Sequence, residues 1–251
     1  MIETHTHPSA RAALNRTLRV AAVGDLHAHL GHEREYRQMF LDISEQADVL
    51  IMCGDLTNLG MPEEAENLAA DLALLRIPAL AVLGNHDHHH GNADAVKRIL
   101  RRSNVIFLED ETFELNDVGF AGVKGFGGGF GNHMLGSFGE EATKHFVTEA
   151  VNEALALENA LVRLNTTRVV VALHYAPIAQ TVQGESPEIF PFVGCSRLAE
   201  TIDRYEIDAV FHGHAHHGTY SGHTPKGVPV YNCSIQVLRR VHNKPFTVIE
   251  V

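Results

Sequence analysis

Cysteine is scarce in this 251-residue chain, and the three that occur are widely spaced: Cys53, Cys195 and Cys233. An odd number without a C-x-x-C pair indicates neither a disulfide framework nor a thiolate zinc site. A long uninterrupted apolar run is also missing, because the best candidate for a membrane span, residues 68–83, contains two charges and a proline. We therefore expect reduced, structural cysteines and no membrane partner.

Residues 1–17 lack an apolar core of signal-peptide length, so we expect a cytoplasmic protein. Basic residues are few. The chain has 20 Lys and Arg and 31 Asp and Glu, which gives a formal net charge of −11 at pH 7. This balance opposes extended nucleic-acid binding, which depends on basic residues. With 45% apolar residues and no low-complexity tract, the chain is expected to form one globular domain over residues 1–251, with 1–17 as a short N-terminal extension.

Three short apolar runs in the first third of the chain each end in glycine and predict buried strands: residues 18–24, 48–54 and 77–84. Between them, residues 33–47 and 62–76 have apolar residues at helical spacing. Such crossovers make neighbouring strands parallel, so the segments that follow the strands emerge at one edge of the sheet. Asp25, Asp55 and Asn85 follow these strands at equal intervals, and we expect them to lie together.

The remaining sequence is typical of an α/β fold. Short alternating runs over residues 105–124 predict antiparallel strands, and residues 137–164 predict a long helix packed by one face. A buried strand over 167–173 ends at His174. The last expected elements are a helix over 196–205 and strands over 208–211, 228–234 and 246–251.

Histidine is unusually abundant, with 18 residues, and most of them cluster in three short segments. The clusters belong to five motifs: Gly24-Asp25-Leu26-His27, Gly54-Asp55, Gly84-Asn85-His86-Asp87, His174, and Gly213-His214-Ala215-His216. Each motif alone is common by chance, but five in this order at strand ends are specific. Together they resemble the calcineurin-like metallophosphoesterase family, whose pattern is D-x-H, G-D, G-N-H-[DE], a lone His and G-H-x-H. The resemblance extends from about Val20 to His216.

The resemblance implies a four-layer α/β/β/α sandwich of two mixed β-sheets flanked by helices. It also implies two divalent metal ions and their ligands: Asp25, His27 and His216 for one, Asn85, His174 and His214 for the other, and Asp55 as the bridge. Oxygen and imidazole donors without thiolate suit Mn, Fe, Zn, Co or Ni. The two aspartates carry less charge than two divalent ions, so the site is expected to attract a small phosphorylated substrate.

A two-metal site activates water and holds the phosphoryl oxygens during in-line displacement. The expected function is therefore hydrolysis of a phosphomonoester or phosphodiester. The leaving alkoxide needs a proton or a positive charge, for which His86 is the candidate. The adjacent Asp87 is expected to orient the His86 ring and favour its charged form.

Other interpretations remain open at this stage. The same fold is similar to a retromer coat subunit that serves as a scaffold, and a hydrolase of a non-phosphate bond would use similar ligands. The run His88–His90 extends the third motif but is expected to be exposed or outside the ligand shell. The segment Gly125–Gly131 lacks a P-loop lysine and is expected to be a flexible loop near the site. Residues 178–196 are the longest candidate for a substrate-facing loop.

Overall fold

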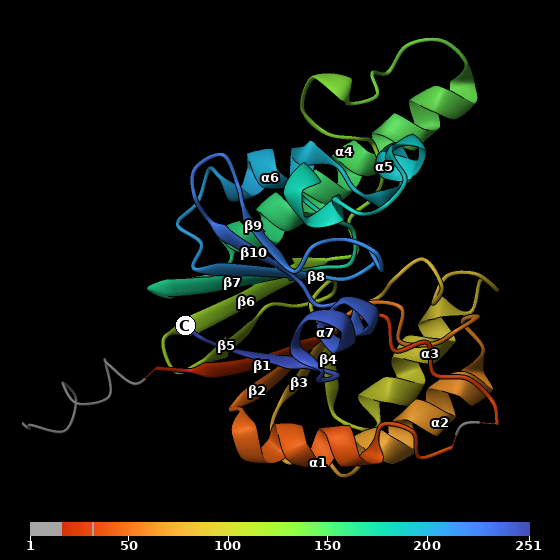
Figure 1. Ribbon diagram of the computed structural model, residues 1–251, viewed down its shortest axis with the longest axis vertical. Helices are drawn as coiled ribbons and strands as arrows, with labels where there is room; N and C mark the ends of the chain where they lie inside the picture. The colour runs from red at the N-terminus through yellow and green to blue at the C-terminus, as the bar shows by residue number, and fades with distance from the viewer. Residues whose placement is uncertain (1–16, 32) are drawn as a thin grey trace, which may run out of the picture.

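Apolar strands form two sheets that pack face to face in the computed structural model, which describes residues 17–31 and 33–251 (Figure 1). The first sheet has the order β11-β1-β2-β3-β4, in which only the edge strand β11 is antiparallel to its neighbour. Its strands are β1 (Arg19–Val23), β2 (Val49–Cys53), β3 (Ala79–Val82), β4 (Val105–Phe107) and β11 (Thr247–Glu250). The N-terminal extension expected over residues 1–17 lies outside the described residues except for Thr17.

The second sheet has the order β5-β6-β7-β8-β10-β9. Its central strands β6, β7, β8 and β10 are parallel, and the edge strands β5 and β9 are antiparallel to their neighbours. The strands are β5 (Phe113–Leu115), β6 (Val118–Val123), β7 (Arg168–Leu173), β8 (Ala209–His212), β9 (Ser221–His223) and β10 (Pro229–Asn232). Both sheets are therefore mixed, as predicted.

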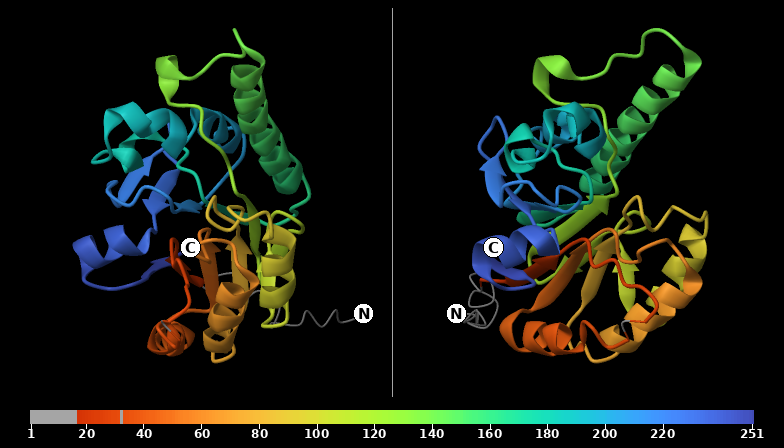
Figure 2. Two further views of the ribbon diagram at one scale, coloured as in Figure 1. Left: turned by 90° about the vertical axis from the view of Figure 1, so that its right-hand side faces the viewer. Right: turned by 45° about the vertical axis from the view of Figure 1, so that its right-hand side comes forward.

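Helices cover the outer faces of both sheets. The first sheet carries α1 (Arg37–Gln46), α2 (Pro62–Leu72) and α3 (Ala93–Arg101), and the second carries α4 (Glu141–Val162) and α6 (Ser196–Ile202). The start of α4 and the segment before it project beyond the rest of the molecule (Figure 2). Two shorter helices, α5 (Phe190–Val193) and α7 (Ile235–His242), lie in the connections of the second half.

The central core fills the space between the sheets. Val20, Ile51 and Leu80 from the first sheet and Phe120 and Phe211 from the second are fully buried there. Separate apolar clusters join each sheet to its own helices, so every strand in the middle of a sheet is covered on both faces. The predicted α/β/β/α sandwich is confirmed.

The prediction of antiparallel strands over residues 105–124 is right only for β5 and β6. β4 instead pairs in parallel with β3, and β6 pairs in parallel with β7. A helix that the sequence patterns did not reveal, α3, connects β3 to β4, and α4 connects β6 to β7. A helical crossover returns the chain to the same end of the sheet, so the next strand runs parallel. Among the described residues, no helix has the length and apolar character needed to span a membrane.

Candidate metal centre

Seven polar side chains from the two sheets meet where the parallel strands end. Asp25 and His27 follow β1, Asp55 follows β2, Asn85 follows β3, His174 follows β7, and His214 and His216 follow β8. Two groups of potential metal donors form there, each with its donor atoms within 4.8 Å of one another. The first group is Asp25, His27, Asp55 and His216, and the second is Asp55, His174 and His214. Asp55 belongs to both groups.

Glycines before the polar residues allow this close approach. A Cβ atom on Gly84 would lie 2.1 Å from Asp55 Oδ1, far inside van der Waals contact. A Cβ atom on Gly54 would lie 2.5 Å from His174 Nδ1, and Gly54 also has a positive φ of 81°. The glycines in the G-D and G-N-H-D motifs are therefore required because the loops after β2, β3 and β7 approach one another without room for side chains.

Backbone strain accompanies the site. Asp25, His27, Asp55 and His214 all have φ between 49° and 68°, in the left-handed region that side-chain-bearing residues rarely adopt. Each such conformation costs on the order of 1 kcal/mol or more and is found mainly where function demands it. These four residues are among the seven predicted ligands. Backbone hydrogen bonds connect their motifs, for example from His27 N to Asp55 O at 2.9 Å.

His174 and His214 each use one ring nitrogen in a hydrogen bond to a backbone carbonyl, which leaves the other nitrogen for the site. His174 Nδ1 lies 2.9 Å from the Cys53 carbonyl oxygen and donates to it, so Nε2 of the neutral ring presents a lone pair. That nitrogen lies 2.9 Å from Asn85 Oδ1 and 3.4 Å from Asp55 Oδ1. His214 is held in the same way by the Phe192 carbonyl at 3.1 Å from Nε2, within the predicted substrate-facing loop. Acceptors that face one another fit a cation held between them.

The charge balance favours the same interpretation. Burial raises the pKa of Asp55 to about 9, and the nearby Asp25 and Asp87 carboxylates add to this shift. Burial also lowers the pKa of His27 to about 4 and that of His174 well below its usual value, so both rings are neutral at pH 7. Neutral imidazoles and crowded carboxylates are the donor set that divalent cations require. The residues present therefore fit a pair of divalent metal ions.

His86 lies at the rim of the site. Its backbone N–H donates to Asp55 Oδ1 at 2.9 Å, its ring Nδ1 lies 2.6 Å from the Asn58 carbonyl oxygen, and its Nε2 lies 4.0 Å from Asp55 Oδ2. The Asn58 carbonyl therefore orients the ring and leaves Nε2 directed toward the donor groups. The contact with Asn58 could not be predicted from the sequence, because a backbone acceptor has no residue signature.

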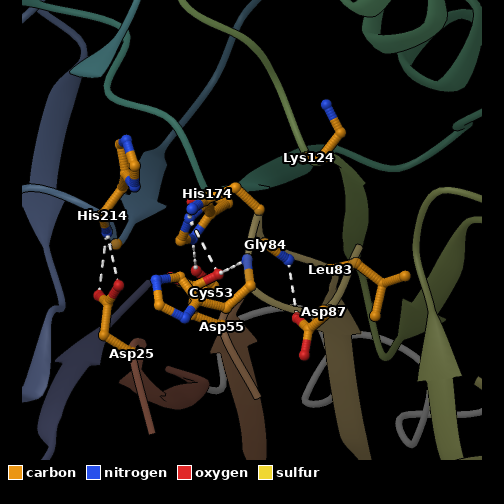
Figure 3. Close-up of polar contacts among 12 residues, drawn as sticks. Asp25, Cys53, Asp55, Leu83, Gly84, Asp87, Lys124, His174 and His214 are labelled. Atoms are coloured by element: carbon orange, nitrogen blue, oxygen red, sulfur yellow. Dashed lines mark hydrogen bonds and ion pairs between the residues drawn. The ribbon is translucent and has the colours of Figure 1, made fainter. Parts of the chain in front are cut away.

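Asp87 does not orient the His86 ring, so that expectation is wrong. Its buried carboxylate accepts the backbone N–H groups of Leu56 at 3.2 Å, Thr57 at 2.8 Å and Gly84 at 2.8 Å, and the Thr57 hydroxyl at 2.6 Å. Figure 3 shows Asp87 turned toward Gly84, which precedes Asn85. Asp87 therefore joins the loops after β2 and β3 and positions Asp55 and Asn85.

Replacement of Asp87 by alanine should lower the free energy of unfolding by at least about 3 kcal/mol. It would leave several buried donors without an acceptor, each at a cost of about 1–3 kcal/mol. Urea denaturation of the metal-free protein measures this effect without a contribution from ligand binding. Asp110→Ala is the control, because Asp110 is partly exposed and pairs with Lys97 and Arg101, so its loss should cost less than about 1 kcal/mol. Equal costs for the two variants would contradict the role of Asp87.

The other expectations for polar segments have mixed outcomes. His88, His89 and His90 are exposed, as predicted, and belong to neither donor group. The Gly125–Gly131 segment is hydrogen-bonded along its backbone, with Gly128 N to Pro191 O at 2.6 Å and Gly129 N to Gly194 O at 2.9 Å. The segment therefore supports the loop that carries Phe192 through these hydrogen bonds. The expectation of a flexible loop is not confirmed.

The fold and the paired donor groups define a metal-dependent phosphoesterase type of site, and comparison with known proteins agrees. The model of the calcineurin-like phosphoesterase family matches residues 18–218. The chain therefore belongs to this family of metal-dependent phosphoesterases, as the five motifs predicted.

A curated relative from Arcobacter nitrofigilis, named as a probable glycerophosphodiester phosphodiesterase, is 25% identical over 183 residues. The match spans 70% of this chain and 59% of that relative. The fold is also similar to that of phosphopantetheinyl hydrolase from Mycobacterium tuberculosis, with a TM-score of 0.66, 16% identity, and coverage of 92% of this chain and 95% of that one. GAP50, described as the anchor in the inner membrane complex of Plasmodium, has a TM-score of 0.55, 14% identity, and coverage of 88% and 72%.

Proposed function

We propose that the protein hydrolyses a small phosphomonoester or phosphodiester with two divalent metal ions. The observation that carries the proposal is the shared position of Asp55, whose two carboxylate oxygens face separate groups of donors. A carboxylate between two sets of imidazole donors is suited to bridge two cations. Asp25, His27 and His216 would hold one ion, and Asn85, His174 and His214 would hold the other.

Two divalent ions held by these residues would supply positive charge for the phosphoryl oxygens and would lower the pKa of the attacking water. The chain's own residues supply orientation and proton transfer. His86 is held by Asn58 so that Nε2 faces the donors, where it donates a proton to the leaving oxygen. Water adds its oxygen to phosphorus, the bond to the leaving oxygen breaks, and the alcohol departs in its neutral form.

The alternative is a metal-binding scaffold that uses the fold without catalysis. GAP50 has a similar fold and is described as an anchor, so the fold alone does not distinguish the two functions. A scaffold has no need for a proton donor beside the metal ligands. The ordered His86 ring, at the rim of a complete donor set, supports the enzyme.

The test is hydrolysis of p-nitrophenyl phosphate and bis-p-nitrophenyl phosphate, with the metal content measured on the same sample. Turnover that disappears on chelation and returns with added manganese supports the proposal, and the ratio of the two rates gives the preference for monoester or diester. About two metal ions per chain without turnover of either ester, or of a wider set of phosphate esters, supports the scaffold. A protein that binds no divalent metal contradicts the ligand assignment.

Metal removal should also destabilise the folded chain. Each ion that binds only the native state at about one hundred times its Kd adds about 2.7 kcal/mol of stability, so chelation should lower Tm by about 5–10 °C for each ion removed. Differential scanning calorimetry with and without chelator measures this shift. The Asp55→Asn variant is the control, since it lacks the shared ligand and its Tm should change much less. An unchanged Tm in the wild-type protein would argue against metal binding by the folded chain.

A further inference from the structure

A cavity of about 390 Å³ opens beside the donor groups on the side of His27 and His216. His86 and Asn58, the proposed proton donor and the group that orients it, form part of its wall. A leaving group protonated by His86 must occupy space next to that ring, because proton transfer requires hydrogen-bond distance. The cavity is therefore the space available to the leaving alcohol, if the proposed function holds.

Helix α7 forms another part of the wall, through Ile235, Gln236 and Arg239. Its first turn is fixed beside the first ligand loop, with Ile235 N bonded to Gly24 O at 3.0 Å. Val237 and Leu238 are buried, whereas Gln236 and Arg239 are exposed and both line the cavity. Residues three apart lie on the same face of a helix. The polar face of α7 is thus turned toward the space beside His86.

The two consecutive arginines of α7 differ in what they contact. Arg240 is engaged by the protein itself, since its guanidinium donates to the carbonyl groups of His216, His217 and Gly218 and holds the loop that follows His214. No ion pair or side-chain hydrogen bond to Arg239 occurs among residues 17–31 and 33–251. Its guanidinium therefore retains its donors for a ligand in the cavity.

Without metal ions the charges around the cavity are mixed, since the carboxyl groups of Asp25 and Glu35 line it together with Arg239. Glu35 already has an interaction partner, so it is not available to a ligand in the way that Arg239 is. Two divalent ions at the adjacent donor groups would make this side of the site more positive. A guanidinium binds carboxylate and phosphate groups with paired hydrogen bonds, which gives both affinity and orientation.

We propose that Arg239 determines substrate specificity by binding a second anionic group, a carboxylate or a phosphate, on the leaving alcohol. This inference rests on the proposed function and names its substrate class: phosphate esters of small alcohols that themselves carry a negative charge. Arg239 is a binding residue for this alcohol, while His86 transfers the proton.

The test compares two esters that differ only at the end of the alcohol. Butyl phosphate and the phosphate ester of 4-hydroxybutanoate have similar leaving groups, one ending in a methyl group and the other in a carboxylate. Each is assayed as the monoester and as its methyl diester, with release of the alcohol as the readout. The wild-type protein should favour the charged ester in kcat/KM by about fivefold or more, mainly through KM.

Arg239→Gln should remove this preference and leave kcat/KM for the butyl esters within about twofold of the wild type. Arg239→Lys should restore part of the preference, because it restores the charge without the paired donors. Arg102→Gln is the matched control, since Arg102 is an exposed arginine directly after α3 whose side chain lies 3.9 Å from Glu66 and does not line the cavity. A wild-type protein without the preference, or an Arg239→Gln variant that keeps it, overturns the inference.

A binding measurement separates this inference from the proposed function. Calorimetric titration of the manganese-loaded protein with 4-phosphonobutanoate and with butylphosphonate requires no turnover. Tighter binding of 4-phosphonobutanoate by about fivefold, lost in Arg239→Gln, supports the subsite even if no ester is hydrolysed. Hydrolysis of the butyl esters with equal binding of the two phosphonates contradicts the role of Arg239 and leaves the proposed phosphoesterase activity intact.

Discussion

Asp55→Asn should reduce kcat/KM by at least about 1000-fold and leave fewer than two metal ions per chain. Asp55 is the one residue shared by both donor groups, so the substitution removes a negative ligand from each proposed ion. Loss of a residue that only supports a metal ligand lowers metal affinity or activity about 10–100-fold. Loss of a ligand shared by both ions should have a larger effect, because it weakens the binding of each ion. Steady-state hydrolysis and elemental analysis of the same preparation measure both effects.

The fold should survive this substitution. Asparagine has the shape of aspartate and keeps an oxygen for the His86 backbone N–H, which now donates to Asp55 Oδ1 at 2.9 Å. The control is Asp117→Asn. Asp117 pairs with Arg168 where β6 and β7 begin, whereas the donors lie where the parallel strands end. Its activity should stay within about twofold of the wild type. An Asp55→Asn variant with two bound ions and near-normal turnover would refute the bridge.

His86→Ala should reduce kcat by about 100-fold or more for esters of alkyl alcohols, with metal content and fold unchanged. A positioned general acid contributes about 10²- to 10⁴-fold, and alkoxides need its proton most. p-Nitrophenolate leaves with little assistance, so its esters should lose much less. The ratio of the two losses distinguishes proton donation from a general disturbance of the site, which would slow both kinds of ester alike.

His89→Ala is the matched control for this prediction. His89 belongs to the same loop, is exposed, and is not among the donor groups, so its replacement should alter neither rate by more than about twofold. The expected pattern requires that His86→Ala retain the metal content of the wild type, because His86 is outside both groups of donors. A His86→Ala variant that hydrolyses alkyl esters at the normal rate with full metal content would exclude the proposed proton transfer.

The two substitutions test different parts of one arrangement. Asp55 lies at the centre, 1% exposed, and its backbone conformation is strained to bring its carboxylate between the sheets. His86 lies at the rim, with 39% of its side chain exposed, where a leaving group can enter and depart. In the proposed function, the buried residue would hold the metal ions and the half-exposed residue would contact the substrate.

The sequence alone predicted the candidate metal donors, partly from local patterns and partly from the family resemblance, which supplied the histidines. Asp25, Asp55 and Asn85 each come directly after an apolar strand, and parallel strands deliver such residues to one edge of a sheet. Residue type then specified the chemistry, since carboxylate, amide and imidazole groups without thiolate select a class of metal. The family resemblance supplied the second sheet, which periodicity alone left open.

Only the tertiary structure decided how the residues around the donors are used. Asp87 is adjacent to His86 in sequence but is bonded to Thr57 and Gly84, and the His86 ring is instead held by the Asn58 carbonyl. Arg239 had no motif, and α7 brings it to the cavity through the contact of Ile235 with Gly24. Strand ends are fixed by local apolar patterns, whereas hydrogen-bond partners depend on which distant segments pack together, and that information appears only in the folded chain.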